Sequence, residues 1–248
     1  MKISVVIPIK NQANILLGNL KEKVLPYFDA CGLEYEVVVS PNGFNPEQRK
    51  ILEEGMAELE GKVRFLPFCE EAGKGRGVKL GIEAATGDYL LIMDADCATD
   101  LSAFDAIKPD LGNFDAFAAN RDLPESKINK RPWLRQLGHT VSISLVRRRF
   151  GLKHVGDTQC GFKCYRGAVA KEMAKRQTIM GFAYDVEHCY FLELNGFRIK
   201  EIPVIWFNDE EGTTVSIANS RKFSADLKKI KRNKDNYILT EEERKALC

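Results

Sequence analysis

Short apolar runs and stretches of helical periodicity alternate along the first half of the chain. The apolar runs span residues 3–9, 35–39, 63–67 and 88–93. Each has the length and composition of a buried strand. The stretches with apolar residues three or four positions apart, which predict helices, span residues 13–28, 46–60 and 77–85. Strands that alternate with helices predict an α/β fold, with a mostly parallel central sheet flanked by helices.

The second half of the chain is less regular. We predict strands over residues 116–120, 159–165 and 199–207, and helices over residues 133–150 and 182–194. The charged segment after residue 220 is predicted to be helical. No internal repeat or low-complexity linker interrupts the chain, so we expect one domain over residues 1–220, followed by a basic helical tail over residues 221–248.

Composition narrows the class of protein. The chain has 248 residues, of which 44% are hydrophobic and 29% charged, and its net charge is +2. A balance this close to neutral gives no reason to expect nucleic acid as a partner. The seven cysteines include no Cys-x-x-Cys pair, which argues against a zinc ribbon or a redox motif and favours a reducing compartment.

Neither a signal peptide nor a membrane span is expected. Pro8 interrupts the first apolar run too early for a signal peptide. No run approaches the roughly 20 apolar residues that a spanning helix needs. We therefore expect a cytoplasmic protein whose contact with a membrane is peripheral.

Two carboxylates follow the end of a strongly apolar run. Residues 89–93 lead directly to Asp94, and Asp96 follows two positions later. In an extended backbone both side chains would point to the same side, at the edge of a parallel sheet where ligands bind. Carboxylate oxygens there can hold a divalent cation that bridges to a diphosphate. The alternative is a polar strand end or the cap of the next helix.

A glycine-rich basic segment, Gly73-Lys74-Gly75-Arg76-Gly77, lies between a predicted strand and a predicted helix. Its glycines allow close approach of the backbone to a ligand, and its two basic side chains can pair with phosphate. The segment lacks the spacing of a Walker A loop and of the dinucleotide fingerprint. Alone it is more typical of a basic turn, but beside the two carboxylates it indicates a phosphate site.

These segments resemble the core of the inverting family 2 glycosyltransferases with the GT-A fold. Asp157-Thr158-Gln159-Cys160-Gly161-Phe162-Lys163 closely resembles the signature of the polyprenyl-phosphate (dolichyl-phosphate) glucosyl- and mannosyltransferases. Residues 182–187 and 199–204 resemble the next two blocks of that subfamily, in the same order. The resemblance implies a nucleotide-sugar-binding half over residues 1–118 and an acceptor-binding half over residues 119–220.

The same resemblance implies a metal-dependent hexosyltransferase. It would bind Mg²⁺ or Mn²⁺ through Asp94 and Asp96, take a UDP- or GDP-hexose as donor, and use a lipid phosphate as acceptor. The implied donor-binding residues are Pro8, Lys10, Asn42, Lys74, Arg76, Asp94, Ala95 and Asp96. The acceptor- or sugar-binding residues would be Gln159 and Glu187, to which the basic pattern of residues 129–153 adds Arg147, Arg148 and Arg149 as residues suited to a phosphate headgroup.

Asp157 and Asp185 are the candidate catalytic residues. A hydroxyl acceptor would need one of them as a base. A phosphate acceptor is already anionic near neutral pH, because its second pKa is about 6, and Asp157 would then orient other groups. Both carboxylates are also compatible with plainer roles in turns, caps or a solvated helix face.

The chain departs from the family pattern at two positions. Asn11-Gln12 stands where the family usually has Asn-Glu, and Pro41-Asn42 where it usually has two aspartates that contact the nucleoside. The sequence therefore leaves the nucleotide open. It also leaves open a transferase that acts on a hydroxyl of a glycan or soluble acceptor, and a non-catalytic relative that binds a nucleotide or glycan.

Basic residues gather beside apolar ones in two segments. Residues 129–153 combine Trp133 with the arginines at 147–149, a pattern typical of helices at a membrane interface. Residues 221–234 repeat the pattern in the tail. Each basic residue near an anionic surface contributes about 1 kcal/mol to binding. We expect peripheral membrane contact here, and the alternative is a core helix followed by a solvated tail.

Overall fold

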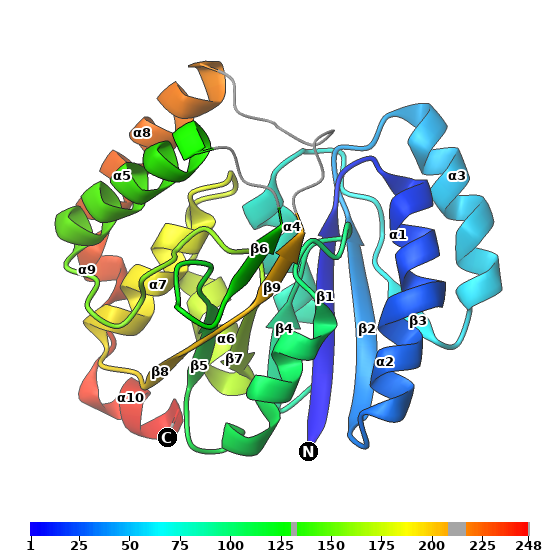
Figure 1. The fold of residues 1–248 in the computed structure, drawn as a ribbon, viewed down its shortest axis with the longest axis horizontal. Helices are drawn as coiled ribbons and strands as arrows, with labels where there is room; N and C mark the ends of the chain where they lie inside the picture. Colours follow the sequence, from blue (N-terminus) through cyan, green and yellow to red (C-terminus); the bar gives the residue numbers. More distant parts are fainter. Residues whose placement is uncertain (130–132, 208–216, 248) are drawn as a thin grey trace.

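The computed structural model describes residues 1–129, 133–207 and 217–247, and only the backbone of residues 133–141 and 217–220 (Figure 1). Its centre is a seven-stranded sheet in the order β3-β2-β1-β4-β7-β5-β8. The strands are β1 (Lys2–Ile9), β2 (Glu34–Pro41), β3 (Val63–Phe65), β4 (Tyr89–Ile92), β5 (Ala116–Ala119), β7 (Lys163–Arg166) and β8 (Ile199–Ile202). Among these strands only β7 is antiparallel to its neighbours, which confirms the predicted mostly parallel sheet.

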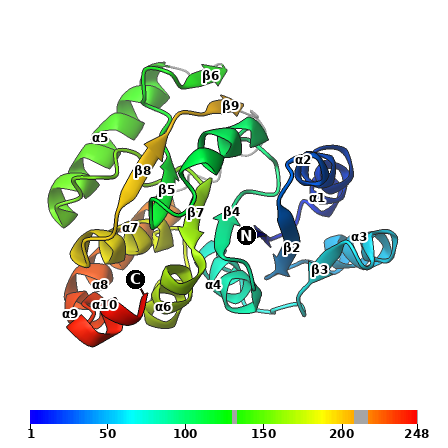
Figure 2. The ribbon, with the colours of Figure 1, turned by 90° about the horizontal axis from the view of Figure 1, so that it is seen from below.

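Helices cover both faces of the sheet (Figure 2). They are α1 (Ala13–Asn19), α2 (Leu25–Ala30), α3 (Pro46–Met56), α4 (Lys74–Ala84), α5 (Trp133–Phe150), α6 (Gly167–Arg176), α7 (Tyr184–Leu194), α8 (Ile217–Arg232), α9 (Lys234–Tyr237) and α10 (Glu241–Leu247). A turn of π-helix over Leu20–Val24 joins α1 to α2. These two helices pack on one face, and α4, α6 and α7 pack on the other. Along β1, Ile3 and Val5 enter the core on the first face, while Val6 enters the core on the second, as the two-residue period of a strand requires.

Three elements differ from the expectation. The run over residues 199–207 divides at Pro203, which has no N–H to donate, so β9 (Ile205–Phe207) leaves the main sheet and pairs with β6 (Lys127–Asn129). Residues 159–162 form a loop, and β7 begins only at Lys163. Helix α6 was not predicted, although its buried residues have helical spacing. Those residues include Val169, Ala170, Met173 and Ala174.

The C-terminal segment packs onto the domain. Ile230, Tyr237 and Leu239 are buried in the core that contains α7. Asn195, which follows α7, donates to Tyr237 O and accepts from Leu239 N, both at 2.8 Å. Within the described residues, no helix has both the length and the apolar character that a membrane span requires.

Helix α7 buries a histidine deep in this core. His188 is 0% exposed, and its Nε2 lies 3.0 Å from Gln177 Oε1. Among the described residues Nδ1 has no hydrogen-bond partner, and the rings of Tyr165 and Tyr184 pack edge-on against the imidazole. Burial, together with the charge of Lys163, lowers the pKa of His188 to about 3, so the ring is neutral at physiological pH.

Stability should therefore depend on His188 at acidic pH. Below pH 6.5 the unfolded chain binds a proton at His188 that the folded chain does not bind. The free energy of unfolding should therefore be highest above pH 6.5 and fall by about 1.4 kcal/mol per pH unit as the pH decreases toward 3. We expect His188→Gln to remove this component, as measured by urea unfolding between pH 7.5 and 4.5. His154→Gln, at an exposed position beside Glu193, is the comparison, because it removes the other described histidine and leaves His188 in place. Equal slopes in wild type and His188→Gln would contradict the account.

Candidate active site

Asp94 and Asp96 lie in a turn beyond the carboxyl end of β4. Cys97 N donates to Asp94 O at 3.2 Å, and Ala98 N donates to Asp96 Oδ1 at 3.0 Å. Cys97 has a φ of 51°, a left-handed conformation of the kind that gathers at functional sites. The backbone is thus turned here and not extended as expected, because the turn's own hydrogen bonds redirect the chain.

A lysine from the start of α4 faces the first of these carboxylates. Lys74 Nζ lies 2.7 Å from Asp94 Oδ1, and the two side chains are 23% and 36% exposed. Burial alone would raise the pKa of Asp94, but the charges of Lys74, Lys163 and Arg121 hold that pKa below its usual value. Asp94 is therefore ionised at neutral pH, with a cation already beside it.

The glycines of segment 73–77 serve close packing between protein segments. A Cβ on Gly75 would lie only 2.6 Å from Ile179 O. Gly75 N donates to Gly181 O at 3.3 Å, which joins the start of α4 to the loop before α7. We expected these glycines to admit a ligand, but Gly75 admits a neighbouring loop, and this contact fixes the position of Lys74.

The other predicted donor-binding residues divide by burial. Asn42 is 1% exposed, and its side chain accepts from Gly73 N at 2.8 Å and donates to Ile9 O at 3.2 Å. Asn42 thus holds the start of α4 against the end of β1. Pro8 and Ala95 are buried, whereas Lys10 is exposed and Arg76 is half-buried and paired with Glu71.

Asp157 lies in a buried ion pair whose partner the sequence did not reveal. Its side chain is 0% exposed, and Arg121 Nε and Nη2 donate to its two oxygens at 2.7 and 3.1 Å. Gln159 N donates to the same carboxylate at 3.0 Å, and the Arg121 guanidinium lies over the Trp206 ring. Burial would lower the pKa of Arg121, but Asp157 raises that pKa above its usual value.

Asp185, the second candidate base, is also paired. It lies in the first turn of α7, 6% exposed, with Oδ1 2.8 Å from Lys163 Nζ. Lys163 is 2% exposed and also donates to Thr158 O, at 3.1 Å, and to Cys160 O. Burial would lower the pKa of Lys163, but Asp185 raises it above its usual value, so the ammonium stays charged.

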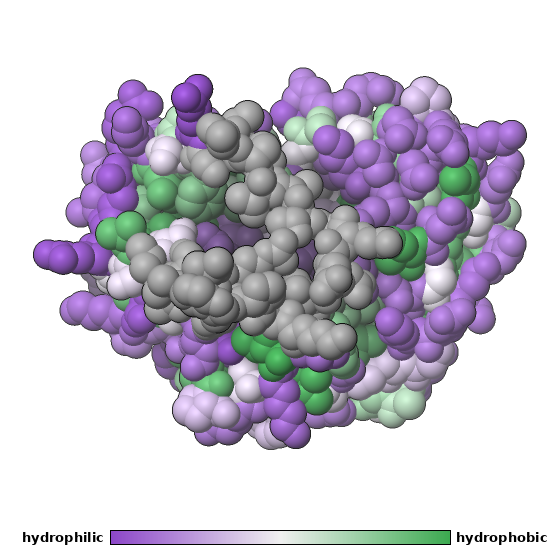
Figure 3. Space-filling view, turned by 45° about the horizontal axis from the view of Figure 1, so that its top comes forward, coloured by the Kyte–Doolittle hydropathy of each residue, from purple (hydrophilic) through white to green (hydrophobic). Residues whose placement is uncertain are grey.

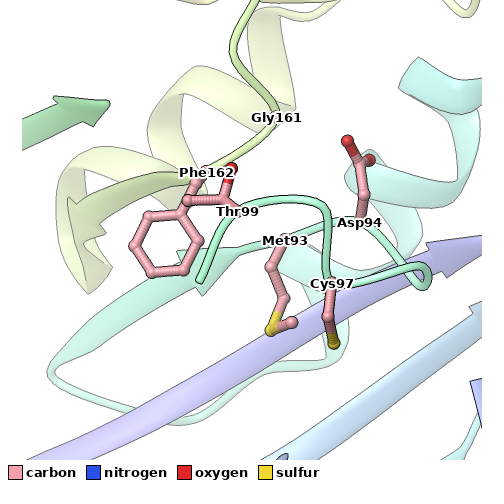
Figure 4. A pocket seen from close by; sticks show the side chains of 6 residues that line it. All are labelled: Met93, Asp94, Cys97, Thr99, Gly161 and Phe162. Atoms are coloured by element: carbon pink, nitrogen blue, oxygen red, sulfur yellow. The ribbon is translucent and has the colours of Figure 1, made fainter. Parts of the chain in front are cut away.

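The loop before β7 meets the turn after β4 at Gly161 (Figure 4). A Cβ on Gly161 would lie 2.2 Å from Asp94 Oδ2, so a larger residue would displace the carboxylate. In Figure 4 the Asp94 carboxylate points away from the side chains of Met93 and Cys97. A small hollow beside the contact is lined by Met93, Asp94, Cys97, Thr99, Gly161 and Phe162. Two segments far apart in the sequence thus form one site.

The remaining predicted residues lie in three places. Glu187 is 1% exposed, and its Oε1 accepts from Thr178 N at 2.8 Å and from Tyr237 Oη at 2.6 Å, so the carboxylate anchors structure inside the domain. Gln159 is half-buried in the loop after Asp157. Arg147, Arg148 and Arg149 form the last turn of α5, which Figures 1 and 2 show at the outer end of the helix, away from β4.

The surface at this edge of the sheet is hydrophilic on one side and more hydrophobic on the other. Figure 3 shows hydrophilic side chains over the side of α1 and α3, and hydrophobic ones gathered on the opposite side, toward α5. Phe207 N of β9 donates to Ala98 O at 2.8 Å, which holds the 42% exposed Phe207 close to the turn of Asp96. Phe182, before α7, is 53% exposed. An exposed apolar side chain, that of Phe207, thus lies close to the turn that carries Asp96.

The family model of Glycosyl transferase family 2 matches residues 4–174. A dolichyl-phosphate beta-glucosyltransferase of Dictyostelium discoideum is 25% identical over 244 residues, which cover 92% of this chain and 73% of that protein. The protein of the same name from Homo sapiens is 25% identical, over 91% of this chain and 74% of its own length. Glycosyltransferase AglD of Haloferax volcanii is 28% identical over 83% of this chain, which spans about a third (33%) of that longer protein.

Solved structures with a similar fold include glucosyl-3-phosphoglycerate synthase of Mycobacterium tuberculosis. One of them superposes with a TM-score of 0.63 at 14% identity, over 97% of this chain and 82% of the other. A second, in complex with Mn²⁺, uridine diphosphate and phosphoglyceric acid, gives a TM-score of 0.62 at 13% identity, over 97% and 80%. At this level of identity the likeness supports the fold alone.

The pair of Arg121 and Asp157 should be strongly coupled. Arg121→Met removes the guanidinium from a buried carboxylate, so we expect the free energy of unfolding to fall by about 3 to 5 kcal/mol in urea denaturation. Combining it with Asp157→Asn removes both charges and should recover most of that loss. Lys245→Met, in an exposed pair with Glu241, should stay within about 1 kcal/mol of wild type. An equal loss in the single and double variants would show that charge pairing is not the cause.

Proposed function

Since this chain belongs to Glycosyl transferase family 2, we propose that it transfers a hexose from a nucleotide sugar to a lipid phosphate at the cytoplasmic face of a membrane. In this transfer a phosphate oxygen of the acceptor forms a bond to the anomeric carbon. The bond from that carbon to the donor diphosphate breaks, and its electron pair leaves with the nucleoside diphosphate. A single displacement of this kind inverts the configuration at the anomeric carbon.

The observation that carries the proposal is the pairing of both candidate bases. Asp157 is bound by Arg121 and Asp185 by Lys163, each in a buried ion pair. A proton taken from a hydroxyl would neutralise one of these carboxylates and leave its cation buried without a counter-charge, which is unfavourable. A phosphate oxygen brings its own negative charge and needs no base. The pairing therefore favours a phosphate acceptor over a hydroxyl acceptor.

The names of the relatives support the same class of acceptor. Several are dolichyl-phosphate beta-glucosyltransferases, which match over nine-tenths of this chain, 92% and 91% in two cases. For the donor we propose a UDP- or GDP-hexose. Lys10, Lys74 and Arg76 are the basic side chains at the donor edge that would pair with its phosphates.

Asp94 and Asp96 would hold a divalent metal ion, Mg²⁺ or Mn²⁺. The donor set fits such an ion, because hard cations prefer carboxylate oxygens and both Asp94 and Asp96 are partly exposed in the turn. No cluster of three or more His, Cys, Asp or Glu side chains suited to a metal occurs among the described residues. The bound ion would neutralise charge on the departing diphosphate.

We propose that the protein touches the membrane through the adjoining ends of α5 and α8. Arg148 and Arg149 are exposed there, and Leu145, one turn earlier, is 64% exposed. Lys231 Nζ of α8 donates to Arg149 O at 3.1 Å, so exposed basic residues of α8 continue the same surface. Charged side chains around an exposed leucine suit an anionic bilayer surface.

Turnover should require a lipid phosphate. With a UDP- or GDP-hexose and Mn²⁺, we expect release of nucleoside diphosphate when polyprenyl phosphate is added and almost none with the matching polyprenol. The rate should fall below about pH 6, where the acceptor phosphate takes up its second proton. Equal turnover with polyprenol would favour a hydroxyl acceptor. If no donor in a panel releases its diphosphate, the chain is a non-catalytic relative.

Binding of the metal ion should require the negative charge of Asp96. Asp96→Asn keeps an oxygen for Ala98 N but removes the negative charge, so we expect weaker Mn²⁺ binding by calorimetry and a loss of turnover of roughly 100-fold or more, with an unchanged melting temperature. Asp100→Asn is the matched control, since this side chain accepts from Ser102 N and can do so as an amide. Near-normal turnover of Asp96→Asn would exclude the metal role.

Replacing two arginines should weaken binding to membranes. At about 1 kcal/mol each, the combined Arg148→Ser and Arg149→Ser variant should bind vesicles rich in anionic lipid roughly 30-fold more weakly in co-sedimentation. Lys50→Ser combined with Lys62→Ser removes the same charge from exposed positions of the α3 side and is the control. If both double variants bind as the wild type does, the contact lies elsewhere.

A further inference from the structure

Lys163 is a buried cation that the proposed transfer leaves without a role. It is the first residue of β7, at the edge of the sheet where Asp94 also lies, and its side chain is 2% exposed. An ammonium has three hydrogens to donate. Lys163 meets three acceptors, namely Thr158 O, Cys160 O and Asp185 Oδ1. Its hydrogen-bonding capacity is thus filled by two groups of one loop and one group of a helix.

The two carbonyls belong to the loop that lies against Asp94. Thr158 directly follows Asp157, and Cys160 directly precedes Gly161. Gly161 has no room for a side chain, because a Cβ would lie 2.2 Å from Asp94 Oδ2. By holding the carbonyl next to Gly161, the ammonium sets how closely this loop approaches Asp94.

Asp185 supplies the charge that balances Lys163 in the interior. It lies in the first turn of α7, and its neighbour Tyr184 packs against the start of α4, where a Cβ on Gly75 would lie 2.7 Å from Tyr184 Cβ. The ammonium therefore joins the loop to the helix that contacts the start of α4, next to Lys74. Protonation of Asp185 would remove the negative charge that this arrangement needs.

We propose that Lys163 is a positioning residue: its ammonium holds the loop over residues 157–161 against Asp94, with Asp185 as its counter-ion and not as a base. The kinetic part of this inference rests on the proposed function. The part that concerns the order of the loop does not depend on the proposed function, so the inference and the proposed function can fail separately.

The test compares Lys163→Met, which keeps the length of the side chain without its charge, with Lys163→Arg and Lys171→Met. Lys171 also donates to a backbone carbonyl, that of Glu83, but from α6. Amide hydrogen exchange measures the order of residues 157–162 and needs no substrate. Steady-state kinetics with lipid phosphate measures kcat and the donor KM.

We expect Lys163→Met to speed exchange in the loop at least tenfold. It should lower kcat roughly 100-fold, the effect of misplacing reacting groups by about 1 Å, and change the donor KM less than threefold. Lys163→Arg should recover at least a tenth of the wild-type kcat, and Lys171→Met should match wild type in both measurements. Normal exchange and normal kcat in Lys163→Met would overturn the proposal. A wild-type protein inactive on every lipid phosphate would overturn the proposed function alone, and exchange would still decide the role of Lys163.

Asp185→Asn separates a counter-ion from a base. A counter-ion matters less once its cation is gone, so Asp185→Asn should lower kcat less in the Lys163→Met background than in wild type and should leave the shape of the pH profile unchanged. Equal losses in both backgrounds, with a changed acidic limb, would identify a base and overturn the proposal. The double variant removes both buried charges together, so it serves for exchange and kcat if Lys163→Met alone does not fold.

Discussion

The antiparallel pairing of β7 with β4 is the constraint on which the rest of the site depends. Because β7 runs opposite to β4, with Lys163 facing Ile92, the loop that precedes β7 lies at the edge where β4 ends. Gly161 then meets Asp94, and the signature segment of the second half reaches the carboxylates of the first. A parallel β7 would carry the same loop to the far edge of the sheet, and the two halves would share a core without sharing a site.

Three of the carboxylates named for chemistry meet a cation from another part of the chain. Asp94 pairs with Lys74, Asp157 with Arg121, and Asp185 with Lys163. Attraction between such charges is strong in a poorly solvated interior, although removing them from water offsets much of it. The benefit of these pairs is therefore one of geometry: they hold loops and helix ends in one arrangement before any ligand binds.

The sequence allowed the fold to be predicted because buried parallel strands are continuous apolar runs and the helices between them keep their period. The resemblance to family 2 is confirmed by the match over residues 4–174, and the α/β class with a GT-A-like fold by the sheet and its structural neighbours. The roles of Arg121 and Lys163 as ion-pair partners were not predicted, because a contact between residues distant in sequence depends on the fold and leaves no local pattern. The expectation that Gly75 makes room for a ligand was wrong for a similar reason, because a sequence does not show which segment packs against a glycine. The metal, donor and acceptor roles of individual residues stay predictions.

Two glycines bring the backbone of helix α4 close to its neighbours, in addition to the buried side chains of Val78 and Ile82. Besides Gly75, Gly81 has no space for a side chain, since a Cβ there would lie 2.3 Å from Val6 Cγ1. At Gly75 the nearest neighbour is the backbone carbonyl of Ile179, so compensating pairs of side-chain mutations, the usual route by which cores drift, cannot make room there. A change of substrate in evolution would therefore have to keep the start of this helix where it is and alter the loops that face it.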